Sequence, residues 1–459
     1  MWPFATLGWP EPDAKQKAEL AYWYPTSDLV TGPDIIFFWV ARMIIAGLEF
    51  MNPGEALDRR VPFKNVYFTG IIRDKQGRKM SKSLGNSPDP IDLIEKYGAD
   101  GLRFGTMNSA PQGNDILFDE ANVELGRNFC NKLWNAARFR QMQGPTERNG
   151  NIVEILARIE DKHLDDDDYA ILDNLCKKLE TLKENFSTYD FSQATQALYA
   201  FFWGDYCDWY LEVSKIRQTD AAVKSHVLAV QDLCLRQFLL MLHPFMPFIS
   251  EELWHALGYG KAGEFIQNAK LDINEMHASL TDNGPFASTT SDGGPVRALF
   301  RYDEDTTADL RVFVSVARAL KARNNLAARR DVKFTLTKTP KAEKYLATQK
   351  AKLLSLCGAS EINLAPPDWI APPSSAAVPT LLGTLYLDLA GTIDKDAERI
   401  RLGKELAQID KHIASQEAKL ANEAFVGKAP AKVIEGARAQ LAENLAKREE
   451  LKRLLAALG

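Results

Sequence analysis

Gly77-Arg78-Lys79-Met80-Ser81-Lys82-Ser83-Leu84-Gly85-Asn86 holds two lysines three residues apart on a segment bounded by turn-forming glycines. Upstream, Asn65-Val66-Tyr67-Phe68-Thr69-Gly70-Ile71-Ile72 is rich in β-branched and aromatic residues, which predicts a buried strand. The lysines would then sit on a loop beyond a strand end, where flexible point charges and close backbone N–H groups can bind an anion. The pattern predicts a polyphosphate-binding loop. A bare K-x-x-K would be explained better by an ordinary exposed basic loop.

Size and composition indicate an ordinary globular protein. The chain of 459 residues is long enough for about three domains, and it is 46% hydrophobic and 25% charged. The net charge of -5 gives no general attraction for nucleic acid, so RNA contacts would have to come from local patches. No apolar run is long enough to span a bilayer and no signal peptide opens the chain, which predicts a cytoplasmic protein without membrane contact.

The five cysteines are scattered, without a C-x-x-C pair or a neighbouring histidine. This spacing disfavours a zinc site and a disulfide framework, and it fits a reducing cytosol. No protein-bound metal is therefore expected. The cysteines are Cys130, Cys176, Cys207, Cys234 and Cys357.

The N-terminal part mixes apolar helix and strand patterns, which predicts part of an α/β sheet. The stretch from Ile35 to Ile45 is apolar on nearly every side and is predicted to be a buried helix, with Asp34 at its start as a cap or a ligand contact. Pro88-Asp89-Pro90 should open a further helix. The first ten residues, with two tryptophans and two prolines, resemble the middle of a domain rather than a polar terminus.

The middle of the chain has a helical period from about residue 120 to residue 260. Asp165-Asp166-Asp167-Asp168 is predicted to be a solvated helix start, favoured at the positive end of the helix dipole, rather than a metal site. His243 is expected to be a buried hydrogen-bonding residue rather than a catalyst.

Beyond residue 260 a Gly-, Ser- and Thr-rich stretch predicts a long loop. A small α+β module should follow, with helices at 310–322 and 342–356, strands at 331–337 and 385–389, and an irregular segment at 366–379. The last part carries two apolar stripes separated by Gly427 and Pro430, which predicts an antiparallel coiled-coil hairpin. The first stripe is Leu402, Leu406, Ile409, Ile413 and Leu420.

Spelled in one letter, Lys79 to Ser83 reads KMSKS, and it resembles the ATP-handling loop of class I aminoacyl-tRNA synthetases. Leu29 to Met43 resembles the active-site helix of the valyl-tRNA synthetases in that class. Asn128 to Phe139 is similar to the helix after their catalytic domain, and Ala197 to Tyr210 to part of their anticodon-binding bundle. The C-terminal hairpin resembles the coiled-coil arm typical of valyl enzymes. The likeness covers nearly the whole chain, most weakly from 261 to 390.

The resemblance implies a fold class and a domain order. Residues 1–115 would be the second half of a Rossmann-like α/β catalytic domain, a partial remnant that carries the KMSKS loop. An all-α helical junction and anticodon-binding bundle would span 116–260, followed by a linker at 261–308, a small α+β module at 309–392 and a coiled-coil tRNA-binding arm at 393–459.

The resemblance favours valine over isoleucine, because isoleucyl enzymes usually carry a terminal zinc-binding cysteine cluster that this sequence lacks. Ile35 and Trp39 match residues that wall the valine pocket in the family, although plain core packing would explain both. An apolar pocket cannot strongly reject threonine, so the family adds a hydrolytic editing domain.

Class I enzymes also need an H-x-G-H motif, and none of the six histidines here has the required partner. The chain is therefore expected to be the C-terminal portion of a synthetase, without the first half of the nucleotide-binding fold and without the editing domain. Thr69 and Pro33 depart from the usual residues near the ATP site, which affects the expected adenosine contacts.

The implied reaction is attack of the valine carboxylate on ATP, followed by transfer of the acyl group to tRNA-Val. Lys79 and Lys82 would stabilise the leaving pyrophosphate, with Mg²⁺ held mainly by phosphates and water. The implied ATP-binding residues are Lys79, Met80, Ser81, Lys82, Ser83, Gly70, Ile71, Ile72, Gly32 and Asp34; the valine pocket would include Ile35 and Trp39.

Two alternatives remain open from the sequence. The chain could be a non-catalytic tRNA-binding fragment, or a subunit of a split enzyme that pairs with a separately encoded N-terminal half. It could also belong to another branched-chain synthetase of the class, the isoleucyl enzymes. Alone, it is expected to bind tRNA in a salt-sensitive way without forming adenylate, and the full-length enzyme is expected to be a monomer.

Overall fold

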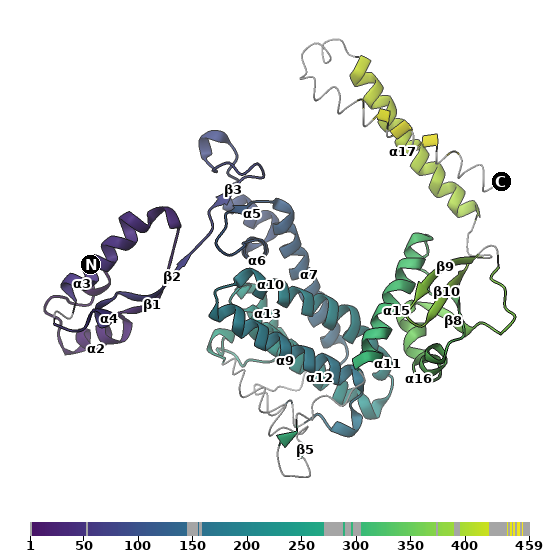
Figure 1. The fold of residues 1–459 in the computed structure, drawn as a ribbon, viewed down its shortest axis with the longest axis horizontal. Coiled ribbons are helices and arrows are strands. Elements are labelled where there is room, and N and C mark those ends of the chain that lie inside the picture. Colours follow the sequence, from purple (N-terminus) through teal and green to yellow (C-terminus); the bar gives the residue numbers. More distant parts are fainter. Residues whose placement is uncertain are drawn as a thin grey trace. The chain divides into compact units, whose positions relative to one another are not determined.

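In the computed structural model of the protein, the chain divides into two compact units, Met1–Thr307 and Ala308–Gly459 (Figure 1). No helix among the residues that the structure describes is long and apolar enough to cross a membrane. The structure describes residues 2–51, 54–144, 155, 158–269, 288–289, 295–296, 304–372, 375–389 and 395–421, together with 438, 441, 442, 444, 445, 448, 449 and 452.

The first unit opens with a pair of parallel strands, β1 (Thr26–Thr31) and β2 (Phe63–Phe68). Parallel strands need a crossover connection, which here is helical. The helices before and between the strands agree with the predicted α/β character of this part. They are α1 (Trp2–Ala5), α2 (Ala14–Trp23), the 3₁₀-helix η1 (Pro33–Ile35), the π-helix η2 (Ile36–Val40), α3 (Ala41–Phe50) and α4 (Leu57–Arg60).

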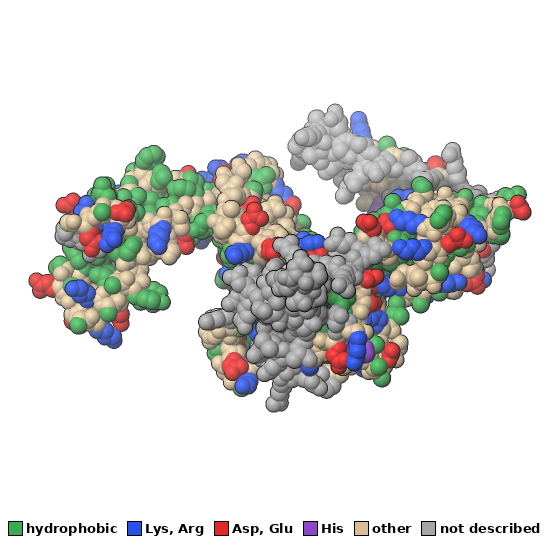
Figure 2. Space-filling view, turned by 60° about the horizontal axis from the view of Figure 1, so that its bottom comes forward, with side chains coloured by type: hydrophobic (Ala, Val, Ile, Leu, Met, Phe, Trp, Pro, Cys, Tyr) green, Lys and Arg blue, Asp and Glu red, His purple; other side chains and the backbone are tan. Residues whose placement is uncertain are grey.

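The helix predicted at 35–45 exists, but the prediction that it is buried is wrong. Val40 and Gly47 are the residues of η2 and α3 that are buried, whereas Phe37 is 84% exposed. A helix that is apolar on all sides becomes buried only where a second layer covers it, and no described element covers this side. Figure 2 shows hydrophobic side chains gathered over the N-terminal elements, at the left of the view. The large exposed side chains here are Val30, Ile35, Phe37, Phe38, Trp39 and Ile45.

A second parallel pair, β3 (Ile72–Arg73) with β4 (Ile116–Leu117), follows β2. The predicted strand at 65–72 is thus two strands, interrupted at Thr69-Gly70-Ile71. Phe63 is the buried residue of β2, so the predicted burial of that strand is wrong as well. Between β3 and β4 lie the 3₁₀-helix η3 (Lys82–Leu84), α5 (Pro90–Tyr97) and α6 (Ala99–Asn108); the predicted helix start at Pro90, capped by Asp89, is confirmed.

A helical bundle follows, as its period predicted. Aromatic side chains from several of its helices and from α6 form the core. Phe129 lies 5.9 Å from Phe202 between ring centroids, Phe202 lies 4.5 Å from Phe238, and all three are buried. The elements are α7 (Glu120–Met142), the 3₁₀-helix η4 (Asp161–His163), α9 (Asp166–Ser187), α10 (Phe191–Ala200), the π-helix η5 (Phe201–Tyr210), α11 (Leu211–Arg217), α12 (Ala221–Leu242), α13 (Pro247–Ala256) and the 3₁₀-helix η6 (Ile266–Asn268).

The aspartate run does begin a helix, since Asp165 caps α9, but it is not solvated as predicted. Asp167 and Asp168 are 2% and 0% exposed. The Trp209 indole donates to Asp167 at 2.8 Å and the Tyr210 hydroxyl donates to Asp168 at 2.7 Å. Hydrogen-bond donors from η5 thus stabilise the buried carboxylates in place of water.

The second unit contains a four-stranded sheet with strand order β8-β7-β10-β9. The predicted helices and the two predicted strands are present. The segment predicted to be irregular instead contains β9, because an edge strand tolerates Pro379 without losing a sheet hydrogen bond. Strand β8 was not predicted. The elements are α15 (Glu304–Arg323), β7 (Val332–Leu336), α16 (Pro340–Cys357), β8 (Ala359–Leu364), β9 (Ser375–Thr380) and β10 (Gly383–Asp388).

A long helix, α17 (Lys395–Ala421), follows this sheet. Ile409 and Ile413 of its predicted stripe are buried, and Leu441 and Leu445 of the second stripe pack against them. The predicted bend between the stripes lies outside the described residues. Within the predicted linker at 261–308, the structure describes η6, a small antiparallel pair, β5 (Ser288–Thr289) with β6 (Pro295–Val296), and the start of α15 at Glu304.

Candidate functional site

Several of the predicted ligand residues, among them Gly32, Gly70 and Ile71, lie where β1 and β2 end. Because the strands are parallel, Thr31 and Phe68 lie at the same edge, and the Thr69 N–H donates to the Thr31 carbonyl at 2.9 Å. Gly32 therefore lies close to Ile71, whose Cδ1 would be 3.4 Å from a Cβ built on the glycine. Ligands of open α/β sheets bind outside the carboxyl ends of the strands, which is this edge.

Gly70 connects β2 to β3 at a point with no room for a side chain. A Cβ at this position would lie 2.0 Å from the carbonyl oxygen of Asn114. The next residue, Ile71, donates its N–H to the Asp115 carboxylate at 3.1 Å, and Ile72 pairs with Ile116 in the β3–β4 ladder. The Gly70–Ile72 backbone is thus fixed against the segment that leads into β4.

Asp74 holds the start of the KMSKS loop, Lys79–Ser83. It is 6% exposed, and its carboxylate accepts hydrogen bonds from the Gln76 and Arg78 N–H groups, at 3.0 and 2.8 Å. The Arg78 guanidinium and the Asn86 amide donate to it at 2.7 and 2.9 Å. The hydrogen bond from Asn86, with those from Arg78, lowers the pKa of Asp74 to about 2. The carboxylate is therefore ionised at neutral pH, and it joins the two ends of the loop.

Asn86 and Ser81 complete the loop. The Ser81 N–H donates to the Asn86 side-chain oxygen at 2.9 Å, and the Asn86 amide reaches the Lys79 carbonyl at 3.3 Å. Ser81 caps η3 by accepting from the Leu84 N–H, and its hydroxyl lies 3.1 Å from that of Ser83. The serines are thus hydrogen-bonded within the loop, whereas Met80 is half-buried.

Lys79 and Lys82 differ from the basic residues around them. Arg73 pairs with Asp115, Lys75 with Asp119 at 2.9 Å and Arg78 with Asp74 at 2.7 Å. Both loop lysines are exposed, and no ion pair of either ammonium group is found in the described part of the chain. They are therefore free cations on a loop whose backbone is fixed.

The predicted valine-pocket residues are near this edge but exposed. Asp34 and Ile35 belong to η1, directly after Gly32, and Trp39 lies in the π-helix that follows. Ile35 is 42% exposed and Trp39 60% exposed. The described residues bring them next to the strand ends without enclosing a pocket around them.

Three residues that organise this site were not predicted as part of it: Asp74, Asn86 and Asp115. A signal existed for the first, because an aspartate three residues before a glycine, as in Asp74-Lys75-Gln76-Gly77, is typical of a tight turn. Asn86 contacts Asp74, which is 12 residues away, and Asp115 contacts Ile71, which is 44 residues away. Local sequence patterns do not reveal such contacts.

Three family models match the chain in succession. Residues 1–119 match tRNA synthetases class I (I, L, M and V), residues 168–336 match the anticodon-binding domain of tRNA ligase, and residues 394–459 match the valyl tRNA synthetase tRNA binding arm. The first match contains the whole KMSKS loop and both pairs of parallel strands.

Individual relatives give the same result. A valine--tRNA ligase of Bacteroides fragilis is 39% identical over 448 residues, covering 96% of this chain and 45% of the relative. A valine--tRNA ligase of Porphyromonas gingivalis is 40% identical and covers 95% of this chain and 44% of the relative. The chain thus spans about half the length of the curated relatives it matches. Among solved structures, an Agrobacterium radiobacter LeuRS in a ternary complex with tRNA and LeuAMS matches 57% of this chain and 32% of its own, with 19% identity and a TM-score of 0.44.

Proposed function

Because this chain belongs to the valyl-tRNA synthetase family, we propose that it serves in the ATP-dependent activation of valine and the transfer of the valyl group to tRNA-Val. The observation that carries the proposal is the pair of lysines Lys79 and Lys82, which form no ion pair with any described residue. They stand on a loop that follows β3 and that Asp74 and Asn86 hold in place. Two unpaired ammonium groups on a fixed backbone can bind a negatively charged ligand.

In the first reaction step, the valine carboxylate attacks the α-phosphate of ATP and pyrophosphate leaves. Negative charge increases on the leaving group, so cations that approach it stabilise the transition state more than the bound substrate. Lys82 would contact the phosphates and Lys79 would assist, while Mg²⁺ would arrive with ATP and be held mainly by phosphates and water. Ser81, Ser83 and Met80 would set the loop conformation.

Adenosine and valine would bind at the strand ends beside this loop. The backbone of Gly70, Ile71 and Ile72 is fixed by Asn114 and Asp115, which supports a role in contacting adenine. Gly32 and Asp34 would lie by the ribose or the amino acid. Ile35 and Trp39 would wall the valine pocket, where apolar shape excludes bulkier side chains.

The exposed apolar face of η2 and α3 would be covered in the working enzyme. The face includes Phe37, Phe38 and Ile45, which are 84%, 64% and 65% exposed. An apolar patch of this kind marks an interaction site. We propose that it packs against a polypeptide that provides the H-x-G-H motif, whether joined to this chain or separately encoded.

The remaining parts would bind tRNA. The helical bundle would contact the anticodon region, and α17 with its packed partner residues would form a coiled-coil arm along the tRNA. With a net charge of -5, this binding would depend on local basic patches and would weaken steeply as salt is added.

The proposal is tested by reconstitution. The chain is combined with the part of the Bacteroides fragilis valine--tRNA ligase that it does not match, and ATP–pyrophosphate exchange is measured with valine, isoleucine and threonine. The proposal predicts exchange that requires both polypeptides and is fastest with valine. Exchange fastest with isoleucine would contradict the valine assignment. Salt-sensitive tRNA binding without exchange in the mixture would support the non-catalytic alternative instead.

A further inference from the structure

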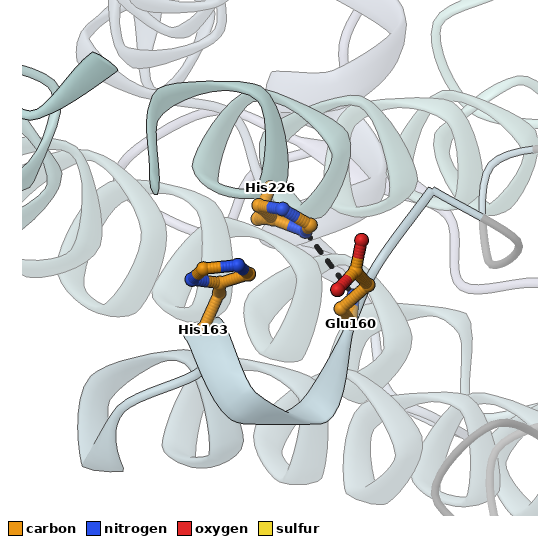
Figure 3. Close-up of side chains that lie close together, drawn as sticks. All are labelled: Glu160, His163 and His226. Atoms are coloured by element: carbon orange, nitrogen blue, oxygen red, sulfur yellow. Dashed lines mark hydrogen bonds between the residues drawn. The ribbon is translucent and has the colours of Figure 1, made fainter. Parts of the chain in front are cut away.

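Glu160, His163 and His226 lie close together in the helical bundle, the first two just before α9 and the third on α12. All three are remote in sequence from the KMSKS loop. One ligand atom from each of the three side chains lies within 4.8 Å of the other two. Figure 3 shows Glu160 and His163 on one turn and His226 on α12, with the side chains facing one another. We propose that these three residues form a zinc-binding site that ties the start of the bundle to α12.

The backbone places the first two ligands on one face. Glu160 directly precedes η4, and the His163 N–H donates to the Glu160 carbonyl at 3.0 Å, closing one 3₁₀ turn. Side chains three residues apart are eclipsed on a 3₁₀-helix, so the carboxylate and the imidazole point the same way. A Glu-x-x-His spacing here thus acts as a local ligand pair.

His226 completes the set from the opposite side. Its ring stacks on that of His163, with 4.3 Å between centroids and 29° between planes, and it is 7% exposed. Its Nδ1 accepts from the Glu160 N–H at 3.2 Å. A metal bound to this ring would displace that hydrogen bond, because a neutral imidazole has a single nitrogen lone pair to offer.

Contacts within the protein hold this turn in place, so the three side chains lie close together before any metal binds. The Arg217 guanidinium donates to the His163 carbonyl at 2.5 Å and also pairs with Asp165 at 3.1 Å. Ligand atoms around zinc are separated by roughly 3.3 Å, because Zn–N and Zn–O distances are about 2.0–2.2 Å in a tetrahedron. The side chains would have to rotate to close the present separations, up to 4.8 Å, and to turn the stacked imidazoles toward one point.

The donor set suits a divalent cation, since it offers one carboxylate and two imidazoles whose ligand atoms lie within 4.8 Å of one another. Lys162 contacts one oxygen of the Glu160 carboxylate, Oε2, and is 70% exposed, so it can turn away as the metal binds. Two imidazoles and a carboxylate favour zinc among the abundant metals, with water as the fourth ligand.

The test uses the whole chain, freed of metal and titrated with Zn²⁺ by calorimetry, and then with Co²⁺ as a visible probe. The proposal predicts one Zn²⁺ per chain, Co²⁺ absorption without a thiolate charge-transfer band, and a higher melting temperature with Zn²⁺. His163→Ala and Glu160→Gln should each weaken Zn²⁺ binding by more than about 100-fold, beyond the loss seen for outer-shell residues. His163→Ala should also abolish the melting shift.

His255→Ala is the matched control. His255 contacts Glu251 at 2.9 Å in the same bundle, but it belongs to no group of metal-ligand residues in the described part of the chain. This variant should bind Zn²⁺ as tightly as the unaltered chain. Equal binding by the His163→Ala chain would overturn the proposal, as would a thiolate band with Co²⁺. Failure of the unaltered chain to bind one Zn²⁺ would overturn it as well. None of these readouts depends on synthetase activity.

Discussion

At the scale of single residues, the KMSKS loop and its flanks contain charged residues with two different roles. Asp74 is buried and pairs within the loop, so its charge serves the conformation. Lys79 and Lys82 are exposed and unpartnered among the described residues, so their charges are available to a ligand. Basic residues on either side are neutralised by aspartates, which leaves the two loop lysines as the local source of positive potential.

Replacing Lys82 by alanine should slow adenylate formation by roughly 10²–10³-fold in the reconstituted enzyme, or about 2.7–4 kcal/mol in the transition state. Valine binding should change little, since the ammonium group acts on the phosphates. Valine-dependent ATP–pyrophosphate exchange measures the rate, and its KM for valine measures binding. Lys75→Ala is the control, because Lys75 is already paired with Asp119 and an exposed pair contributes little. A Lys82→Ala enzyme as fast as the control would refute the assigned role.

Asp74→Asn should loosen the loop at neutral pH. The ionised carboxylate stabilises the loop fully above the ordinary pKa of 3.8, and this contribution is lost as the pH falls through about 2. The substitution removes the charge at every pH. Hydrogen exchange at pH 7 should therefore be faster for the Gln76 and Arg78 amides, which donate to this carboxylate. Unchanged protection of both amides would show that the charge does not hold the loop.

At the scale of secondary structure, periodicity predicted most helices, because apolar residues recur along one face of each. It did not reveal the π-helical geometry of η2 and η5, since π-hydrogen bonding leaves the apolar composition unchanged. Periodicity also predicted that the Ile35–Ile45 helix and β2 are buried, and both predictions are wrong. Burial there depends on a covering layer of structure, which the apolar pattern does not encode. The Glu160–His163–His226 cluster was missed because two of its members are 63 residues apart.

Gly70→Ala should displace the connection between β2 and β3. The added methyl group would lie 2.0 Å from the Asn114 carbonyl oxygen, and such overpacking typically costs about 1–3 kcal/mol. The melting temperature should fall, and the loop should shift away from the strand ends.

Gly204→Ala in η5 is the control, because nothing lies within 4 Å of the added Cβ and alanine favours helix. That variant should be as stable as the original chain or slightly more stable. Equal melting temperatures for the two variants would mean that the close approach at Gly70 is not structurally required.

At the scale of the whole molecule, the chain combines a charged loop for a small anionic ligand with extended helical elements. The order of the domains followed from resemblance rather than from physical pattern, and the proposed boundaries remain predictions. The buried pair Ile409 and Ile413, with Leu441 and Leu445 against it, gives the C-terminal stripes a shared core. A substitution in this core can therefore test the proposed tRNA-binding arm.

Ile413→Ala should destabilise that arm by about 2–5 kcal/mol, because the side chain is 3% exposed and leaves a cavity. If the arm binds tRNA, affinity should fall, and the salt dependence should become shallower as phosphate contacts are lost. Filter binding at several salt concentrations measures both. His412→Ala, at an exposed neighbouring position, should change neither. Full tRNA affinity in a chain with a melted arm would assign binding to the bundle instead.

The most direct test is whether ATP covers the two loop lysines. In the reconstituted enzyme, lysines are acetylated with and without ATP and Mg²⁺, and the modified sites are quantified by mass spectrometry. ATP should protect Lys79 and Lys82 strongly, while Lys64, exposed on β2, should react equally in both conditions. Equal acetylation of all three lysines, at ATP concentrations that support exchange, would contradict the account.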